Sequence, residues 1–227
     1  MIIDTHCHIY ASEMENAEEI IMEAADNDIH MVLNGTDPSS NREVLELSDK
    51  YDNVHAALGY FYTLADEITD EEIELLDRQL GSDNVVAVGE IGLDYYHTKD
   101  NRDKQIELFE NMLILAEKHD VVGSLHSYQG SAEMAQQFIR LGFYIGVGGT
   151  ITHKNNKKAR RMLENTDINH LLLETDSPYL SPQEKMGEMN TPLNIRYVVR
   201  KLAEELDMEK SEVIEITTEN ARNLFTI

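Results

Sequence analysis

Short apolar runs alternate with amphipathic segments along the whole chain, and this alternation restricts the fold more than any other feature. Most of the apolar runs lack the polar–apolar alternation of a half-solvated strand, so we expect parallel strands covered on both faces. The segments between them have the period of helices, and two further helices are expected near residues 191 and 211. The seven expected strands lie at residues 2–8, 31–36, 54–59, 85–94 (with its exit loop), 121–128, 143–149 and 171–176.

A (β/α) barrel and an open doubly wound sheet both fit this alternation. Against the open sheet, no Gly-x-Gly-x-x-Gly or phosphate-binding loop follows an early strand. Candidate ligands lie instead at the ends of several strands, and a closed barrel brings such ends to one rim. We therefore predict an α/β fold of the TIM-like (β/α) barrel class, with seven recognisable strands where a standard barrel has eight. No linker or internal repeat divides the chain, so residues 1–227 are expected to form a single domain.

Composition excludes several classes of protein. The formal net charge of −24 should repel polyanions, so avid binding of long duplex DNA is not expected. The single cysteine, Cys7, excludes an internal disulfide framework and fits a reducing compartment. No apolar run approaches the roughly 20 residues that a membrane span needs, and strand residues begin at Ile2, where a signal region would lie. We expect a cytoplasmic protein without membrane contact, and the sequence does not indicate an oligomeric state.

His6 and His8 end the first strand and form the first candidate metal site. Side chains alternate faces along a strand, so these two imidazoles point the same way and can bind one divalent cation. A chance pair of polar residues at a strand end is the alternative reading of this pattern alone. Acidic residues and another histidine at later strand ends favour the metal site.

The later candidates are Glu90, His126 and Asp176. A mixed set of imidazoles and carboxylates suits Zn, Mn, Ni or Fe more than Ca, and it does not identify the metal. Two ions about 3.5–4 Å apart would need a bridging acid, for which Glu90 is the natural candidate. Glu174 and Asp4 lie one layer below Asp176 and His6, where each could support the ligands or form a structural ion pair.

Five stretches, in order and spread nearly from end to end, carry a resemblance to a known family. They are residues 4–8 (DTHCH), 89–95 (GEIGLDY), 130–135 (GSAEMA), 172–180 (LLETDSPYL) and 217–225 (TTENARNLF). The chain resembles the TatD family of metal-dependent hydrolases, a branch of the amidohydrolase-like barrels. None of the motifs is decisive alone, but together they are highly specific.

The resemblance implies a barrel with one or two divalent metals that hydrolyses phosphodiester bonds in DNA or small substrates. By resemblance, the first metal would be held by His6, His8 and Asp176. Glu90 would bridge the metals and His126 would bind the second, while Asp176 would orient or deprotonate the attacking water. Mg remains possible beside Zn, Mn, Ni and Fe. Given the charge, a small phosphodiester or short oligonucleotide is the expected substrate. Hydrolysis of amides or lactones, and a non-catalytic descendant that binds a metal or ligand, are the alternatives.

Three departures from the family pattern weaken the second metal site. The family usually has two central histidine-bearing strands, and only residues 125–130 (LHSYQG) are present here, so one β/α unit is missing. Residues 59–63 (GYFYT) replace the family's Gly-x-His-Pro-His. His153 stands where the family often has an aromatic residue, so we consider it as a rebuilt ligand or as a surface histidine. His97 could touch substrate from an exit loop. The only basic cluster could bind a phosphate or simply be solvated: Lys154, Lys157, Lys158, Arg160 and Arg161.

Overall fold

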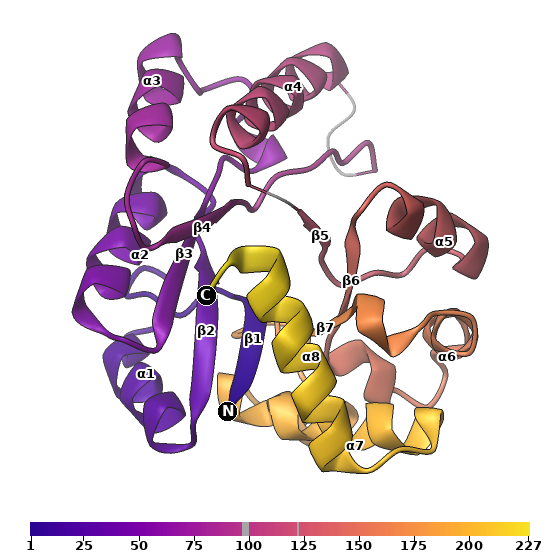
Figure 1. Ribbon diagram of the computed structural model, residues 1–227. Coiled ribbons are helices and arrows are strands. Elements are labelled where there is room, and N and C mark those ends of the chain that lie inside the picture. Colours follow the sequence, from indigo (N-terminus) through magenta and orange to yellow (C-terminus); the bar gives the residue numbers. More distant parts are fainter. Residues whose placement is uncertain (97–99, 122) are drawn as a thin grey trace. The chain divides into compact units, whose positions relative to one another are not determined.

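The computed structural model describes residues 1–96, 100–121 and 123–227 (Figure 1). His97, a candidate substrate contact, lies outside these residues. The chain divides into two compact units. The first unit comprises Met1–Val32 and Gly123–Ile227, and the second comprises Leu33–Val122. The expectation of a single domain stays a prediction.

The first unit contains the first strand and all elements of the C-terminal half. Its three later strands form a parallel sheet in the order β5-β6-β7. Short 3-10 turns η2 (Gly149–Thr152), η3 (Ile168–His170), η4 (Gln183–Lys185) and η5 (Pro192–Asn194) connect these elements. The strands and helices are β1 (Ile2–Cys7), α1 (Ala17–Asp26), β2 (Ile29–Asn34), which continues into the second unit, β5 (Ser124–Leu125), α5 (Ala132–Arg140), β6 (Tyr144–Val147), α6 (Lys157–Leu163), β7 (Leu171–Leu173), α7 (Ile195–Leu206) and α8 (Lys210–Phe225).

The core of the first unit lies where β1 and β7 meet the C-terminal helices. Helix α8 runs alongside β1 and also packs on β7 and α7 (Figure 1). Its inward face is apolar, with Val213 and Leu224 buried, and the whole of β7 is buried. A strand without a solvated face needs this cover, which is why its three residues are all leucine. The packing fixes the place where the chain leaves β7, and this is the start of the candidate site.

The second unit contains α2 (Pro38–Lys50), β3 (Val54–Leu58), η1 (Tyr62–Leu64), α3 (Asp70–Gln79), β4 (Val85–Val88) and α4 (Arg102–Lys118). Strands β3 and β4 pair in parallel. The helix starts follow the capping rules: Asp37 accepts hydrogen bonds from Ser39 N and Ser40 N, and Thr69 forms a reciprocal capping box with Glu72. None of the helices in the described ranges has the length and apolar character of a membrane-spanning segment.

The fifth strand is much shorter than the sequence suggests. We expected it over residues 121–128, but only Ser124–Leu125 pair as a strand in the described part of that range. The reason lies at Ser127, whose φ of 43° is left-handed and turns the chain out of the strand. Its N–H donates to the buried carboxylate of Glu174 at 2.6 Å, and this hydrogen bond stabilises the turn. A contact between residues so distant in sequence cannot be inferred from local propensity.

Candidate metal centre

His6, His8 and Asp176 bring three potential ligand atoms together within the first unit. The Nε2 atoms of His6 and His8 lie 3.1 Å apart. Asp176 Oδ1 lies 3.7 Å from His6 Nε2 and 3.5 Å from His8 Nε2. All three residues are buried. The convergence follows from the strand alternation, which places both imidazoles on one face of β1.

Backbone hydrogen bonds place Asp176 opposite the two histidines. Asp176 N donates to His6 O at 2.9 Å, and His8 N donates to Ser177 O at 2.6 Å. Asp176 has a left-handed φ of 57°, a conformation that aspartate tolerates better than most residues. The segment after β7 thus continues alongside β1, and it aims the carboxylate at the imidazoles without any strand pairing of its own.

Burial keeps His6 in the form that binds metals. Burial, together with the neighbouring His126 and His8 imidazoles, lowers the pKa of His6 well below its ordinary value. A neutral imidazole has a lone pair available, whereas a protonated one has none.

The donor set fits a divalent ion. In a tetrahedral zinc site with bonds of about 2.1 Å, neighbouring ligand atoms lie roughly 3.4 Å apart, which agrees with the three separations found here. Two nitrogens and one carboxylate oxygen are also the donors that Zn, Mn, Ni and Fe accept. His6, His8 and Asp176 could therefore hold one such ion.

His126 belongs to the same cluster, and a buried acid lies beside it. Its Nε2 lies 3.7 Å from Asp176 Oδ1, and its ring stacks on His6 with centroids 3.6 Å apart. Its Nδ1 lies 3.1 Å from Oε1 of Glu174, which is fully buried. Gly146 makes room for this acid, because a Cβ there would lie 2.2 Å from Glu174 Oε2. Of the two readings of Glu174, support of a ligand is therefore the one that its contacts favour.

Asp4 supports the site through the segment that follows β7. Its carboxylate accepts hydrogen bonds from Thr175 N at 2.9 Å and from Thr175 Oγ1 at 2.5 Å. Burial raises the pKa of Asp4 to about 7, although the Thr175 hydrogen bonds act in the opposite direction. Asp4 therefore ties β1 to the residue next to Asp176.

Tyr10 is a site residue that the sequence reasoning missed. Its hydroxyl lies 3.4 Å from Nδ1 of His8, and its side chain is buried. The signal was present, because Tyr10 continues the alternation of His6 and His8 by two more residues. Cys7, on the opposite face, is a buried core residue, as the same alternation predicts.

The other candidates from the sequence are each described by their own contacts. Glu90 follows β4 in the second unit, where its N–H donates to Gly35 O at 2.9 Å, and its bridging role stays a prediction. Nε2 of His153 donates to the carbonyl of Ser181 at 3.0 Å, so that nitrogen is not available to a metal. Two members of the basic cluster form ion pairs, Arg160 with Glu205 and Arg161 with Glu133.

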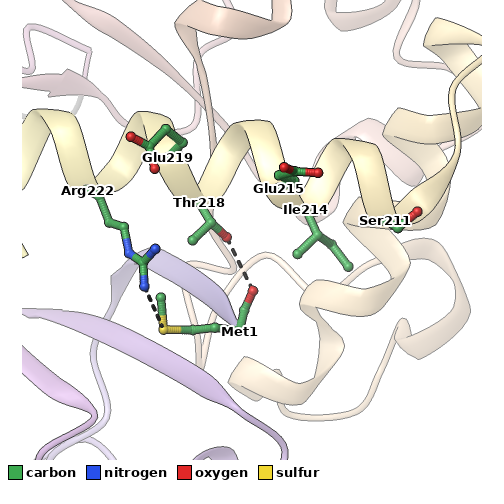
Figure 2. Close-up of a pocket in the computed structure, with 7 residues that line it drawn as sticks. All are labelled: Met1, Ser211, Ile214, Glu215, Thr218, Glu219 and Arg222. Carbon is green, nitrogen blue, oxygen red and sulfur yellow. Dashed lines mark hydrogen bonds between the residues drawn. The ribbon is translucent and has the colours of Figure 1, made fainter.

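A separate pocket lies where α8 passes the chain's first residue (Figure 2). Thr218 Oγ1 donates to Met1 O at 3.3 Å, and Arg222 reaches Met1 Sδ. The pocket therefore lies at the beginning of β1, whereas His8 follows the end of this extended strand, roughly 20 Å further along. It is distinct from the metal centre.

Comparison with known proteins identifies the family of the chain. The model of the family described as TatD related DNase matches residues 3–126 and residues 120–226. The chain belongs to the TatD family. Both matching segments of the TatD model include residues 120–126, as expected if one histidine-bearing strand now stands where the family has two.

Relatives that match over nearly their full length support this family assignment. YabD of Bacillus subtilis, described as an uncharacterized metal-dependent hydrolase, is 34% identical over 254 aligned positions that cover 100% of both chains. Because this chain has only 227 residues, the alignment must contain gaps in it, opposite residues of YabD. The crystal structure of YjjV, a TatD homologue from Escherichia coli, superposes with a TM-score of 0.93 at 29% identity, covering 100% of this chain and 98% of YjjV.

The comparisons confirm the predicted fold class and the coarse function. A TatD-family protein from Entamoeba histolytica, 20% identical with a TM-score of 0.83 over 99% of this chain and 97% of its own, shares the fold. The chain has the α/β, TIM-like fold class of the TatD family, in a shortened form with seven strands in the described residues. It is a metal-dependent hydrolase of this family.

Proposed function

We propose that this TatD-family enzyme hydrolyses phosphodiester bonds in small or short nucleotide substrates at the centre formed by His6, His8 and Asp176. The observation that carries the proposal is the convergence of two imidazole nitrogens and one carboxylate oxygen within 3.7 Å. The name of the matching family, TatD related DNase, supports a phosphodiester rather than an amide or lactone. The charge of −24 supports a short substrate, because a long polyanion would be repelled.

A divalent metal bound at such a centre supplies Lewis acidity and lowers the pKa of a coordinated water towards ~7. The protein's own groups would do the rest. His6 and His8 hold their Nε2 atoms towards Asp176, and burial keeps His6 neutral. Asp176 is proposed to orient the attacking water and to accept its proton on the carboxylate.

His126 and Glu90 are proposed to complete the ligand set. Oε1 of Glu174 lies 3.1 Å from Nδ1 of His126, whose Nε2 lies 3.7 Å from Asp176 Oδ1, and Glu174 is proposed to orient the ring. Glu90 is proposed as the acid that bridges to a second ion. The missing β/α unit removes other groups that the family uses for this ion, so the second site is expected to be weaker than the first.

A substrate panel tests the proposed reaction. The full chain, stripped of metal and reconstituted with Mn²⁺ or Zn²⁺, is assayed with bis(p-nitrophenyl) phosphate, short oligonucleotides, a lactone and an aryl amide. We expect metal-dependent turnover of the phosphodiesters and little of the other two. Turnover of lactone or amide alone would replace the proposal with the alternative hydrolase class, and turnover of none would indicate a non-catalytic descendant.

Asp176→Asn tests the role of the carboxylate. Asparagine keeps the shape but cannot accept the proton, so we expect kcat to fall by roughly 10²–10⁴-fold with an unchanged circular dichroism spectrum. Asp83→Asn, at an exposed position of the second unit, is the matched control. Near wild-type turnover by Asp176→Asn would remove this residue from the mechanism.

A further inference from the structure

The loop that follows Asp176 exposes large apolar side chains. The exposed fractions are 48% for Tyr179, 40% for Leu180, 63% for Met186 and 60% for Met189. These four residues, on the loop 177–190, are called the apolar ledge below. Single exposed apolar residues need no explanation, but four on one short loop beside a reactive centre do.

Several hydrogen bonds join the two ends of the loop, although its apolar side chains face solvent. Asn190 N donates to Pro178 O at 3.1 Å, and Asn190 Nδ2 donates to Thr175 O and Tyr179 O. Ser181 Oγ donates to Glu188 O at 2.8 Å. These bonds bring the end of the loop back onto its beginning. The ledge is thus held in place before any ligand arrives, which lowers the entropic cost of binding.

Neighbouring elements hold the middle of the loop. Gln183 N donates to Thr152 Oγ1 at 2.7 Å, and His153 Nε2 donates to Ser181 O. Gly149 allows close packing, because a Cβ there would lie 2.3 Å from Leu180 O. His153, considered above as a metal ligand, therefore has a direct contact with the loop that carries the ledge.

Tyr179 joins the ledge to the metal centre. Its ring lies edge-on to His8 with centroids 5.9 Å apart, and its N–H donates to Asp176 O at 2.7 Å. Its hydroxyl donates to Glu13 Oε2 at 2.5 Å. Tyr179 is thus held by hydrogen bonds at its backbone and at its hydroxyl, while the residue is 48% exposed.

The charged residues around the ledge indicate what kind of group it accepts. Lys185 pairs with Glu188, and Arg200 pairs with Glu184, so these cations are already matched by acids. Glu13 adds a further negative charge beside Tyr179. A second phosphate is therefore disfavoured here, whereas an uncharged planar group would gain stacking on the ring.

We propose that the apolar ledge binds the nucleobase of a short nucleotidyl phosphodiester, by stacking on Tyr179, while the phosphate occupies the metal centre. This inference rests on the proposed phosphodiesterase function and specifies its substrate class. Tyr179 acts as a specificity residue: it contacts the part of the substrate that does not react.

Two substrates with the same leaving group test the ledge. Thymidine 5′-(p-nitrophenyl phosphate) and methyl p-nitrophenyl phosphate differ only in the group that would reach it. We expect the reconstituted wild type to favour the thymidine ester in kcat/KM by about tenfold or more, in the range known for base–aromatic stacking. In Tyr179→Leu this ratio should fall close to one, mainly through KM.

Two further variants sharpen the result. Tyr179→Phe keeps the ring and should retain most of the ratio, which separates stacking from the hydrogen bond to Glu13. Leu141→Ala removes an apolar side chain that is 73% exposed at the C-terminal end of α5. This variant should leave the ratio unchanged. An unchanged ratio in Tyr179→Leu would overturn the proposal, and so would an equal loss in Leu141→Ala.

A binding measurement separates failure of the ledge from failure of the proposed function. Calorimetry with the metal-loaded protein compares thymidine 5′-monophosphate with methyl phosphate. Tighter binding of the nucleotide that is lost in Tyr179→Leu supports the ledge, even if the wild type turns over no phosphodiester. Equal binding of the two ligands by the wild type overturns the ledge, even if phosphodiesters are hydrolysed.

Discussion

Glu174 is the residue that we propose to orient His126. Its Oε1 meets both His126 Nδ1 and the N–H of Ser127. Glu174→Gln keeps the shape but removes the negative charge beside the imidazole. Since such supporting contacts are typically worth 10–100-fold in metal affinity, we expect a loss of about that size with the fold intact. Competition titration with a metal indicator measures it.

Gly146→Ala provides an independent route to the same effect. The new Cβ would clash with Glu174 Oε2, so the acid must shift away from its present position. Gly81→Ala is the matched control, because a Cβ there meets only Arg78 O at 3.4 Å. Wild-type metal affinity in both Glu174→Gln and Gly146→Ala would assign Glu174 a purely structural role.

Tyr10 is expected to act on His8 in a similar way. The Tyr10 hydroxyl lies beside Nδ1, and Tyr10→Phe removes it while the ring continues to fill the core. We expect metal affinity to weaken by up to about tenfold, the low end for a supporting contact. Tyr60→Phe is the control, because Tyr60 is also buried but donates to Glu72 O in the second unit. Equal effects of the two variants on metal binding would refute this role.

Among the elements, α3 and α4 of the second unit are joined at Asp77. Its Oδ2 accepts from Lys118 Nζ at 2.5 Å, and its Oδ1 lies 2.8 Å from His119 Nε2. The hydrogen bond from Lys118, and then that from His119, lowers the pKa of Asp77. The pair is partly exposed, so Asp77→Asn should lower the free energy of unfolding by less than about 1 kcal/mol at pH 7.

This contribution should depend on pH in a defined direction. A carboxylate whose pKa is lowered by folding stabilises the protein above its unfolded pKa, and the stabilisation is lost as pH falls through the folded value. Urea unfolding should therefore show a difference between wild type and Asp77→Asn that shrinks as the pH falls from about 4 to lower values. Glu74→Gln, in an exposed pair with Arg78, is the control. A difference that grows at low pH would contradict the assignment.

Elements with local signals could be predicted, and those that depend on distant contacts could not. The starts of α2 and α3 lie at the capping residues Asp37 and Thr69, which are local signals that a sequence displays. The alternation along β1 predicted that His6 and His8 share a face. The left-handed turn at Ser127 is stabilised by the distant Glu174, which local sequence patterns do not reveal. The predicted length of β5 was therefore wrong. Asp176 was proposed as a metal ligand from its place after a strand and from the family resemblance. The resemblance was needed because no local pattern indicates which distant carboxylate lies beside a histidine pair.

At the scale of the whole molecule, the charge of −24 opposes any long polyanion. Added salt weakens this repulsion, because it shortens the range of electrostatic interactions from about 30 Å at 0.01 M to about 8 Å at 0.15 M. A protein that holds DNA with basic groups loses affinity as salt rises. Under the proposed function, this enzyme should behave in the opposite way towards long substrates.

The prediction is therefore an inverted salt dependence. Between about 0.02 and 0.2 M NaCl, kcat/KM for a long single-stranded DNA should rise, whereas kcat/KM for a small singly charged phosphodiester should change little. Charge reversal at Lys157 and Lys158, which are exposed on α6, makes the molecule more negative and should steepen the rise. A fall in kcat/KM for the long DNA with salt would show instead that local basic groups recruit it. Steady-state rates at fixed metal concentration decide between the two, because only the sign of the slope is needed.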